Sequence, residues 1–210
     1  MGIFEMNMIP AIQEVQEALA LIGLLLDDME TARQLVESEI AKIKQDPVEV
    51  SELIIEKQLQ PLLRVMTRSS FAALEGICYR IKNLALVLCN YKGIPVTQQE
   101  QENVLEKRVN QDGKEVSHYL ETLENMKFSF KMLNKSFGKE YIMVSHDKWM
   151  KMRKAVEIRN RITHPKNLAD MKISGADYLD ESVGFEWFSE KLDDCLSQSA
   201  SFPKLIRSRS

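Results

Sequence analysis

The sequence is poor in the residues that interrupt regular structure or build special scaffolds. Its 210 residues include 8 glycines, 6 prolines and 3 cysteines, a composition that excludes collagen-like, disordered and disulfide-scaffold proteins. The number of cysteines is odd, and they are widely spaced, at Cys78, Cys89 and Cys195. They fit neither a disulfide framework nor a CxxC metal half-site, and therefore favour a reducing compartment.

A strong excess of one charge and a long apolar run are also absent. The chain has 28 lysines and arginines against 31 aspartates and glutamates, which excludes a generally polybasic protein but allows a local basic site. The longest apolar run, residues 18–26, is too short to cross a bilayer. The first ten residues lack the positive segment of a secretory signal. We therefore expect a cytoplasmic protein without a membrane segment.

The apolar residues recur at steps of three and four along most of the chain, which predicts helices. The helices expected from this periodicity cover residues 10–46, 51–92, 116–137, 145–164 and a segment after Ser174. Residues 94–115 are polar and predict a loop that has room for one short helix around residues 100–108. No strand alternation of useful length is present. The pattern predicts an all-α, up-and-down bundle of about five helices, in one large domain or a domain with an extension.

The charges are unevenly distributed along the chain. Residues 146–172 carry eight basic residues and three acidic ones, whereas residues 173–196 carry seven acidic residues and one basic one. An anionic ligand would explain the basic segment. A solvated helix face is the more ordinary explanation of a charge cluster, and the sequence leaves both explanations open.

The end of the fourth expected helix, RNRITHP at residues 159–165, is the one group of residues that indicates chemistry. The sequence contains no P-loop, no dinucleotide glycine pattern and no nucleophile elbow. On a helical wheel, Arg159 falls in the middle of the apolar arc, Asn160 at its edge and Arg161 on the polar side. A buried arginine is costly unless it is paired or faces a polar cleft.

The last residue of this expected helix, His164, precedes Pro165 and sits at the negative end of the helix dipole. An imidazole in this position can act as a general acid or base, and a nearby guanidinium can hold a phosphate. Asn160 lies one turn earlier and could orient His164. An Arg–His pair near a helix end is also compatible with a simple C-terminal cap.

The motif Arg159-Asn160-x-x-x-His164 resembles the RNxxxH form of the R-x(4–6)-H motif of the HEPN superfamily. The surroundings are similar as well, in the helix end at residues 158–166, the segment around residues 173–188 and the earlier helix around residues 70–76. The resemblance covers about residues 50–200. It divides the chain into a long N-terminal helix or extension at residues 1–46, a HEPN-like helical domain at residues 48–200 and a flexible tail at residues 201–210.

The resemblance implies a helical bundle that dimerises with its motif helices facing each other. Many members of the superfamily are metal-independent endoribonucleases that serve as toxins, in phage defence or in RNA processing. By position, Arg159 would stabilise the phosphorane, Asn160 would hold the geometry and His164 would act as acid or base. Arg161 and Lys166 would bind the RNA.

Two further residues follow from the resemblance. Some members use an acidic residue of the preceding helix, for which Glu75 is the candidate, although a surface carboxylate on a helix is an equally simple explanation. The subgroup whose toxin is adenylylated by its antitoxin has a tyrosine two residues after the histidine. Lys166 stands at that position here, which puts this form of control in doubt.

The sequence therefore predicts an endoribonuclease that cleaves single-stranded RNA through a 2′,3′-cyclic phosphate, without a cofactor or metal. The expected partners are RNA, a second copy of the chain and an antitoxin or regulatory protein. One alternative is a non-catalytic HEPN module that binds RNA, a nucleotide or a partner protein. Another is a structural adaptor that uses the long first helix as its functional surface.

Overall fold

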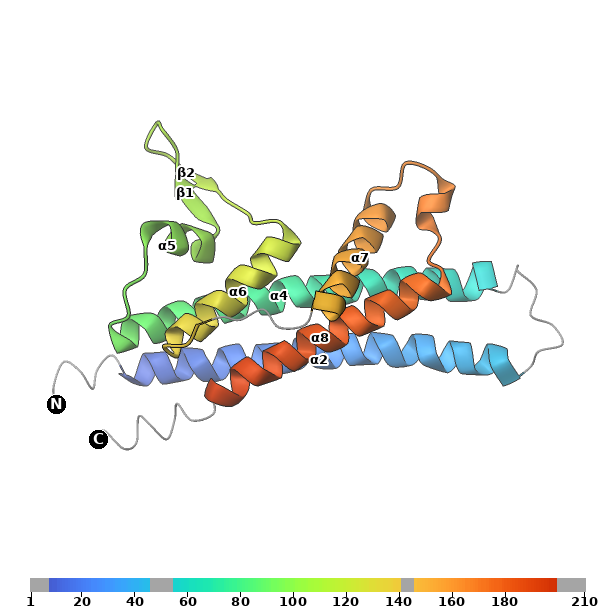
Figure 1. The fold of residues 1–210 in the computed structure, drawn as a ribbon, viewed down its shortest axis with the longest axis horizontal. Coiled ribbons are helices and arrows are strands. Elements are labelled where there is room, and N and C mark those ends of the chain that lie inside the picture. The colour runs from blue at the N-terminus through green and yellow to red at the C-terminus, as the bar shows by residue number, and fades with distance from the viewer. Residues whose placement is uncertain (1–7, 46–54, 141–145, 200–210) are drawn as a thin grey trace. The chain divides into compact units, whose positions relative to one another are not determined.

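The protein is described by a computed structural model that covers residues 8–45, 55–140 and 146–199. Six α-helices and one two-stranded hairpin account for most of these residues, and the fold is all-α as expected (Figure 1). In chain order the elements are α2 (Met8–Gln45), η2 (Ile55–Leu59), α4 (Gln60–Lys92), α5 (Gln98–Leu105), β1 (Lys107–Val109), β2 (Glu115–Ser117), α6 (Thr122–Ser136), α7 (His146–Thr163), η3 (Leu168–Met171) and α8 (Gly175–Ser199). Within the described residues, no helix has the length and apolar character needed to cross a membrane.

The chain forms two compact units. Among the described residues, the first unit comprises residues 8–22, 75–140 and 189–199, and the second comprises residues 23–45, 55–74 and 146–188. The long helix α2 gives buried residues to each of them, Ile22 to the first and Val36 to the second. The separate N-terminal extension expected from the sequence stays a prediction, and the expected tail lies outside the described residues.

The helix ends follow local sequence signals. Ser174 and Asp177 bond reciprocally before α8, with Asp177 N donating to Ser174 Oγ at 3.1 Å and Ser174 N donating to Asp177 Oδ2 at 2.9 Å. Gly93 and Gly138 follow α4 and α6 with φ of 67° and 69°, a left-handed conformation that glycine adopts readily. These N- and C-terminal signals place the helix ends close to where the sequence predicts them.

The hairpin in the first unit corrects one expectation. The third helix was expected to begin near Val116, but Val116 lies in β2, and α6 begins only at Thr122. The turn is formed by Asn110, whose Oδ1 accepts hydrogen bonds from Asp112 N at 3.0 Å and Lys114 N at 2.9 Å. Two strands of three residues are too short to show an alternating pattern, which is why the periodicity did not indicate them.

A buried lysine holds together the connecting segments of the first unit. The Lys82 side chain is 1% exposed and donates to Glu106 Oε1 at 2.9 Å, Asn125 Oδ1 at 2.7 Å and the Asn103 carbonyl at 3.4 Å. Three acceptors satisfy the three hydrogens of the ammonium group, which makes burial of the charge tolerable. The chain's three cysteines are also buried in this unit as free thiols.

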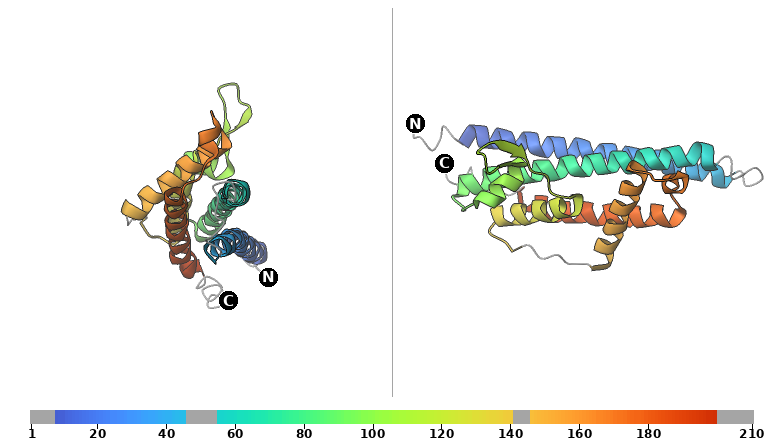
Figure 2. Two further views of the ribbon diagram at one scale, coloured as in Figure 1. Left: turned by 90° about the vertical axis from the view of Figure 1, so that its right-hand side faces the viewer. Right: turned by 90° about the horizontal axis from the view of Figure 1, so that it is seen from above.

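The second unit is built where α7 runs across α8 (Figure 2). The indoles of Trp149 and Trp187 meet edge to face, with ring centroids 5.2 Å apart. Gly184 of α8 lies against the α7 backbone, where a Cβ added to it would be 2.9 Å from Met152 Cα. The close approach of the two helices therefore depends on the absence of a side chain at Gly184.

Replacing Gly184 with alanine should lower the free energy of unfolding by about 1–3 kcal/mol, because a backbone contact leaves the added methyl no room. This loss should outweigh the roughly 1 kcal/mol that alanine gains over glycine in a helix. The matched control is Gly175→Ala at the start of α8, where an added Cβ meets nothing within 4 Å. Urea unfolding measures both variants, and equal stability of the two would contradict the close helix contact.

Candidate functional site

The candidate site lies at the C-terminal end of α7, in the second unit. The helix ends at Thr163, and the His164 amide donates to the Asn160 carbonyl at 2.9 Å as the last bond of the helical pattern. The ring of Pro165 disfavours helical backbone at the residue before it and removes a donor. The sequence thus predicted the end of this helix correctly.

Arg159 is half-buried, whereas its neighbours Ile158 and Ile162 are fully buried. Its guanidinium carbon lies 6.0 Å from the ring centroid of Phe71 in α4, at the outer range of a cation–π contact. The Nη1 group donates to Asn160 Oδ1 at 3.0 Å. The position in the apolar arc is therefore confirmed, and the arginine is held by an aromatic ring and an amide oxygen.

The motif residues Asn160 and His164 are both exposed. The Asn160 amide oxygen accepts from Arg159, so in this structure it orients the arginine, whereas the sequence suggested that it could orient the histidine. The imidazole of His164 has no hydrogen-bond partner within the described part of the chain. The ring is therefore open to an incoming molecule.

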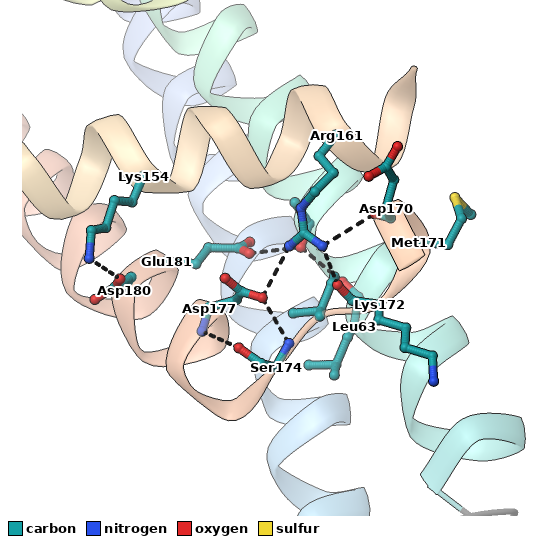
Figure 3. Close-up of polar contacts among 12 residues, drawn as sticks. Leu63, Lys154, Arg161, Asp170, Met171, Lys172, Ser174, Asp177, Asp180 and Glu181 are labelled. Carbon is teal, nitrogen blue, oxygen red and sulfur yellow. Dashed lines mark hydrogen bonds and ion pairs between the residues drawn. The ribbon is translucent and has the colours of Figure 1, made fainter. Parts of the chain in front are cut away.

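Arg161 occupies the centre of an internal network (Figure 3). Its Nη1 donates to the Lys172 carbonyl at 2.6 Å and the Asp170 carbonyl at 3.4 Å, and its Nη2 pairs with Asp177 Oδ2 at 3.1 Å. Asp177 is also the residue that caps α8. The contacts of Arg161 thus stabilise the connection between α7 and α8, while its predicted role in substrate binding stays a prediction.

The connection between α7 and η3, residues 164–167, is short, and the side chain of Asp170 binds its backbone amides. Asp170 Oδ2 accepts from the amides of Lys166 at 2.7 Å and Asn167 at 3.2 Å. Asn167 and Asp170 form a capping box that begins η3. The side chains of Lys166 and Leu168 point outward and are exposed, Leu168 to 87%. Lys166 therefore offers its charge to solvent, and its predicted role in RNA binding stays a prediction.

Several basic residues of α7 form ion pairs with acidic residues of α8. Lys151 and Lys154 both pair with Asp180 of α8, the latter at 3.1 Å, and Lys148 lies 3.9 Å from Glu186. The hydrogen bond from Lys151, aided by that from Lys154, holds the pKa of Asp180 below its ordinary value. With Arg161 and its partner Asp177 included, four of the eight basic residues in the segment 146–172 are thus paired with acidic residues of α8.

The predicted acidic residue, Glu75, lies at the edge of the first unit. The Thr122 hydroxyl donates to Glu75 Oε1 at 3.4 Å, from the beginning of α6. The predicted catalytic role of Glu75 stays a prediction.

Sequence reasoning missed three polar residues of α4, Gln60, Arg64 and Arg68, which we call the α4 stripe. Spacing of four residues places them on one face of the helix. Each binds backbone of the segment that contains the motif: Gln60 bonds to both the amide and the carbonyl of Ile173, Arg64 to the carbonyl of Met171 and Arg68 to the carbonyl of Ile162. Their i, i+4, i+8 spacing was a signal in the sequence, but it did not indicate which segment they would hold.

A fourth residue that sequence reasoning missed is Glu181 of α8, which is only 1% exposed. Its Oε2 accepts from the Thr67 hydroxyl at 2.7 Å, and its Oε1 has no hydrogen-bond partner among the described residues. Burial raises the pKa of Glu181 to about 7, and the nearby Asp177 adds to the increase. The Glu181 carboxyl inside the second unit therefore has a pKa close to neutral pH.

The described residues contain no group of three or more His, Cys, Asp or Glu side chains that could hold a metal ion. The site consists instead of a held arginine, an exposed histidine and an exposed lysine around the end of α7. Compared with known proteins, the chain matches no family model, no curated protein and no solved structure.

Proposed function

We propose that the protein is a metal-independent endoribonuclease that cleaves single-stranded RNA at the end of α7. The 2′-hydroxyl attacks the adjacent phosphorus in line, the 5′-oxygen leaves and a 2′,3′-cyclic phosphate forms. His164 accepts or donates the proton, and Arg159 stabilises the charge on the phosphorane. Because the nucleophile is part of the substrate, no cofactor is needed.

The observation that carries this proposal is a partly buried Arg159 with side-chain contacts on the same helix end as an exposed His164. Contacts with Phe71 and Asn160 hold the guanidinium in one place. A donor that is already oriented has no reorganisation to undergo in the transition state, and this is the main source of electrostatic catalysis. The open imidazole of His164 can reach a proton on a bound substrate.

The proposal includes a homodimer. Arg159 and His164 are about 140° apart on an ideal helix, so one chain cannot easily direct both at one phosphate. Two copies of the helix end around a two-fold axis can combine the arginine of one chain with the histidine of the other. The role as a toxin or phage-defence effector, and control by an antitoxin or regulatory protein, follow from the resemblance to the HEPN superfamily.

The test is cleavage of mixed single-stranded RNA by the purified chain with and without EDTA. We expect cleavage to continue in EDTA and to leave 2′,3′-cyclic phosphate ends, which phosphatase treatment and mass spectrometry identify. His164→Ala should abolish it while the chain stays folded by circular dichroism. Cleavage that requires Mg²⁺ or Mn²⁺ would refute the mechanism, and RNA binding without cleavage would favour the non-catalytic module.

A further inference from the structure

The last carbonyl groups of a helix lack partners within the helix, and those of α7 lie inside the candidate motif. The carbonyl of Ile162 is one of them. Arg68 Nη2 donates to its oxygen at 2.8 Å. The contact is a charge-assisted hydrogen bond, and it puts a positive charge at the negative end of the helix dipole. Ile162 stands three residues after Arg159 and two before His164, so this bond fixes the backbone between them.

We infer that Arg68 is a positioning residue, which sets the end of α7 and thereby the place at which each chain presents its Arg159 and its His164 to the shared sites. This inference rests on the proposed function. Arg68 is itself exposed, but its contact is with main chain and does not depend on which side chains the motif presents. The same face of α4 gives Phe71, three residues further on, to the guanidinium of Arg159. One helix face thus holds both the arginine and the backbone that leads to the histidine.

The other residues of the α4 stripe supply the reason why this placement is rigid. Arg64 Nη1 donates to the Met171 carbonyl at 3.2 Å, and Gln60 makes two bonds with the backbone of Ile173, at 2.8 and 2.9 Å. The α4 stripe therefore binds the backbone on both sides of the exposed residues 164–169. A segment that is fixed at two points on one helix loses little conformational freedom when it binds substrate. This matters because misplacement of the reacting groups by about 1 Å costs up to about 100-fold in rate.

The experiment compares Arg68→Met with Arg64→Met in the full-length chain. Methionine keeps the unbranched aliphatic stem of each arginine and removes the guanidinium, which deletes one bond to a backbone carbonyl. Only the bond of Arg68 lies inside the motif. Arg68→Met should reduce kcat at least about tenfold with little change in KM, and Arg68→Lys should restore much of the loss because an ammonium can also donate to Ile162. Arg64→Met removes a bond to Met171, beyond the motif, and should therefore reduce kcat much less than Arg68→Met.

Two readouts separate positioning from other roles. If Arg68 bound RNA directly, its loss would raise KM and weaken the salt dependence of binding while kcat stayed constant, and this result would overturn the inference. Amide hydrogen exchange gives a readout that does not need activity. The His164 amide should exchange faster in Arg68→Met than in Arg64→Met, and equal exchange would overturn the inference even if the wild type cleaves RNA. A wild type that does not cleave RNA refutes the proposed function, and His164 exchange then still decides whether Arg68 positions the motif.

Discussion

Replacing Arg159 with alanine should reduce the rate of RNA cleavage by about 100- to 1,000-fold, since one preorganised donor to a developing charge is worth about 3–4 kcal/mol. Lysine should not rescue the loss, because an ammonium is a point charge that cannot reproduce the planar guanidinium or its two contacts. Single-turnover cleavage of a labelled oligonucleotide measures the rate. The loss should appear in kcat, because the charge that Arg159 stabilises develops only in the transition state.

The matched control for this variant is Lys166→Ala. The Lys166 side chain is exposed, so its removal should weaken RNA binding in a way that diminishes as the salt concentration rises, while kcat is kept. Arg161→Ala is unsuitable as a control, because loss of its bonds to Lys172, Asp170 and Asp177 should also destabilise the second unit. Equal, small losses for Arg159→Ala and Lys166→Ala would indicate a binding face and contradict catalysis by Arg159.

Mixing two inactive variants tests whether the site is shared between chains. A dimer of one Arg159→Ala chain and one His164→Ala chain would contain one site with both residues missing and one site that is intact. After the chains exchange at random, about a quarter of the wild-type activity should return. No recovery from stable mixed dimers would show that Arg159 and His164 act within one chain.

The free energy of unfolding should fall by about 3 kcal/mol as the pH rises from about 4.5 to about 7, through the single carboxyl of Glu181. Burial raises its pKa from an ordinary value of 4.5 to about 7 in the folded chain. Between these values the folded state binds the proton and the unfolded state does not, so stability decreases with increasing pH. Below the unfolded pKa this stabilisation is fully present, and above about pH 7 it is lost.

Glu181→Gln isolates this contribution from the other titrating groups. The amide keeps an acceptor for the Thr67 hydroxyl and carries no charge at any pH. At pH 8 the variant should be more stable than the wild type, and at pH 4 the two should be similar. Urea unfolding at a series of pH values gives the difference. A difference that does not change with pH would show that Glu181 titrates as it does in water.

The sequence predicted the fold well wherever a local signal acts over a few residues. Apolar steps of three and four gave the α-helices, Pro165 gave the end of α7, and the Ser174–Asp177 pair gave the beginning of α8. The hairpin was missed because its strands have only three residues each and its turn is formed by side-chain contacts of Asn110, neither of which has a periodic signature.

The candidate site was predictable only in part. A helical wheel indicated that Arg159 faces the apolar side of α7, because orientation around a helix depends on sequence spacing alone. The wheel showed Arg161 on the polar side but not its partners, because Asp177 and the carbonyls of residues 170 and 172 come from the chain beyond the helix. The same limit applies to Arg68, which lies 94 residues before Ile162.

The distribution of two residue types gives each unit its own spectroscopic reporter. Both tryptophans of the chain, Trp149 and Trp187, belong to the second unit, whereas all three cysteines belong to the first. Burial raises the pKa of Cys78 to about 12, so a maleimide reagent would label it only after the first unit opens. Indole fluorescence and thiol labelling, recorded on the same unmodified chain, therefore distinguish an opening of either unit from a concerted loss of both.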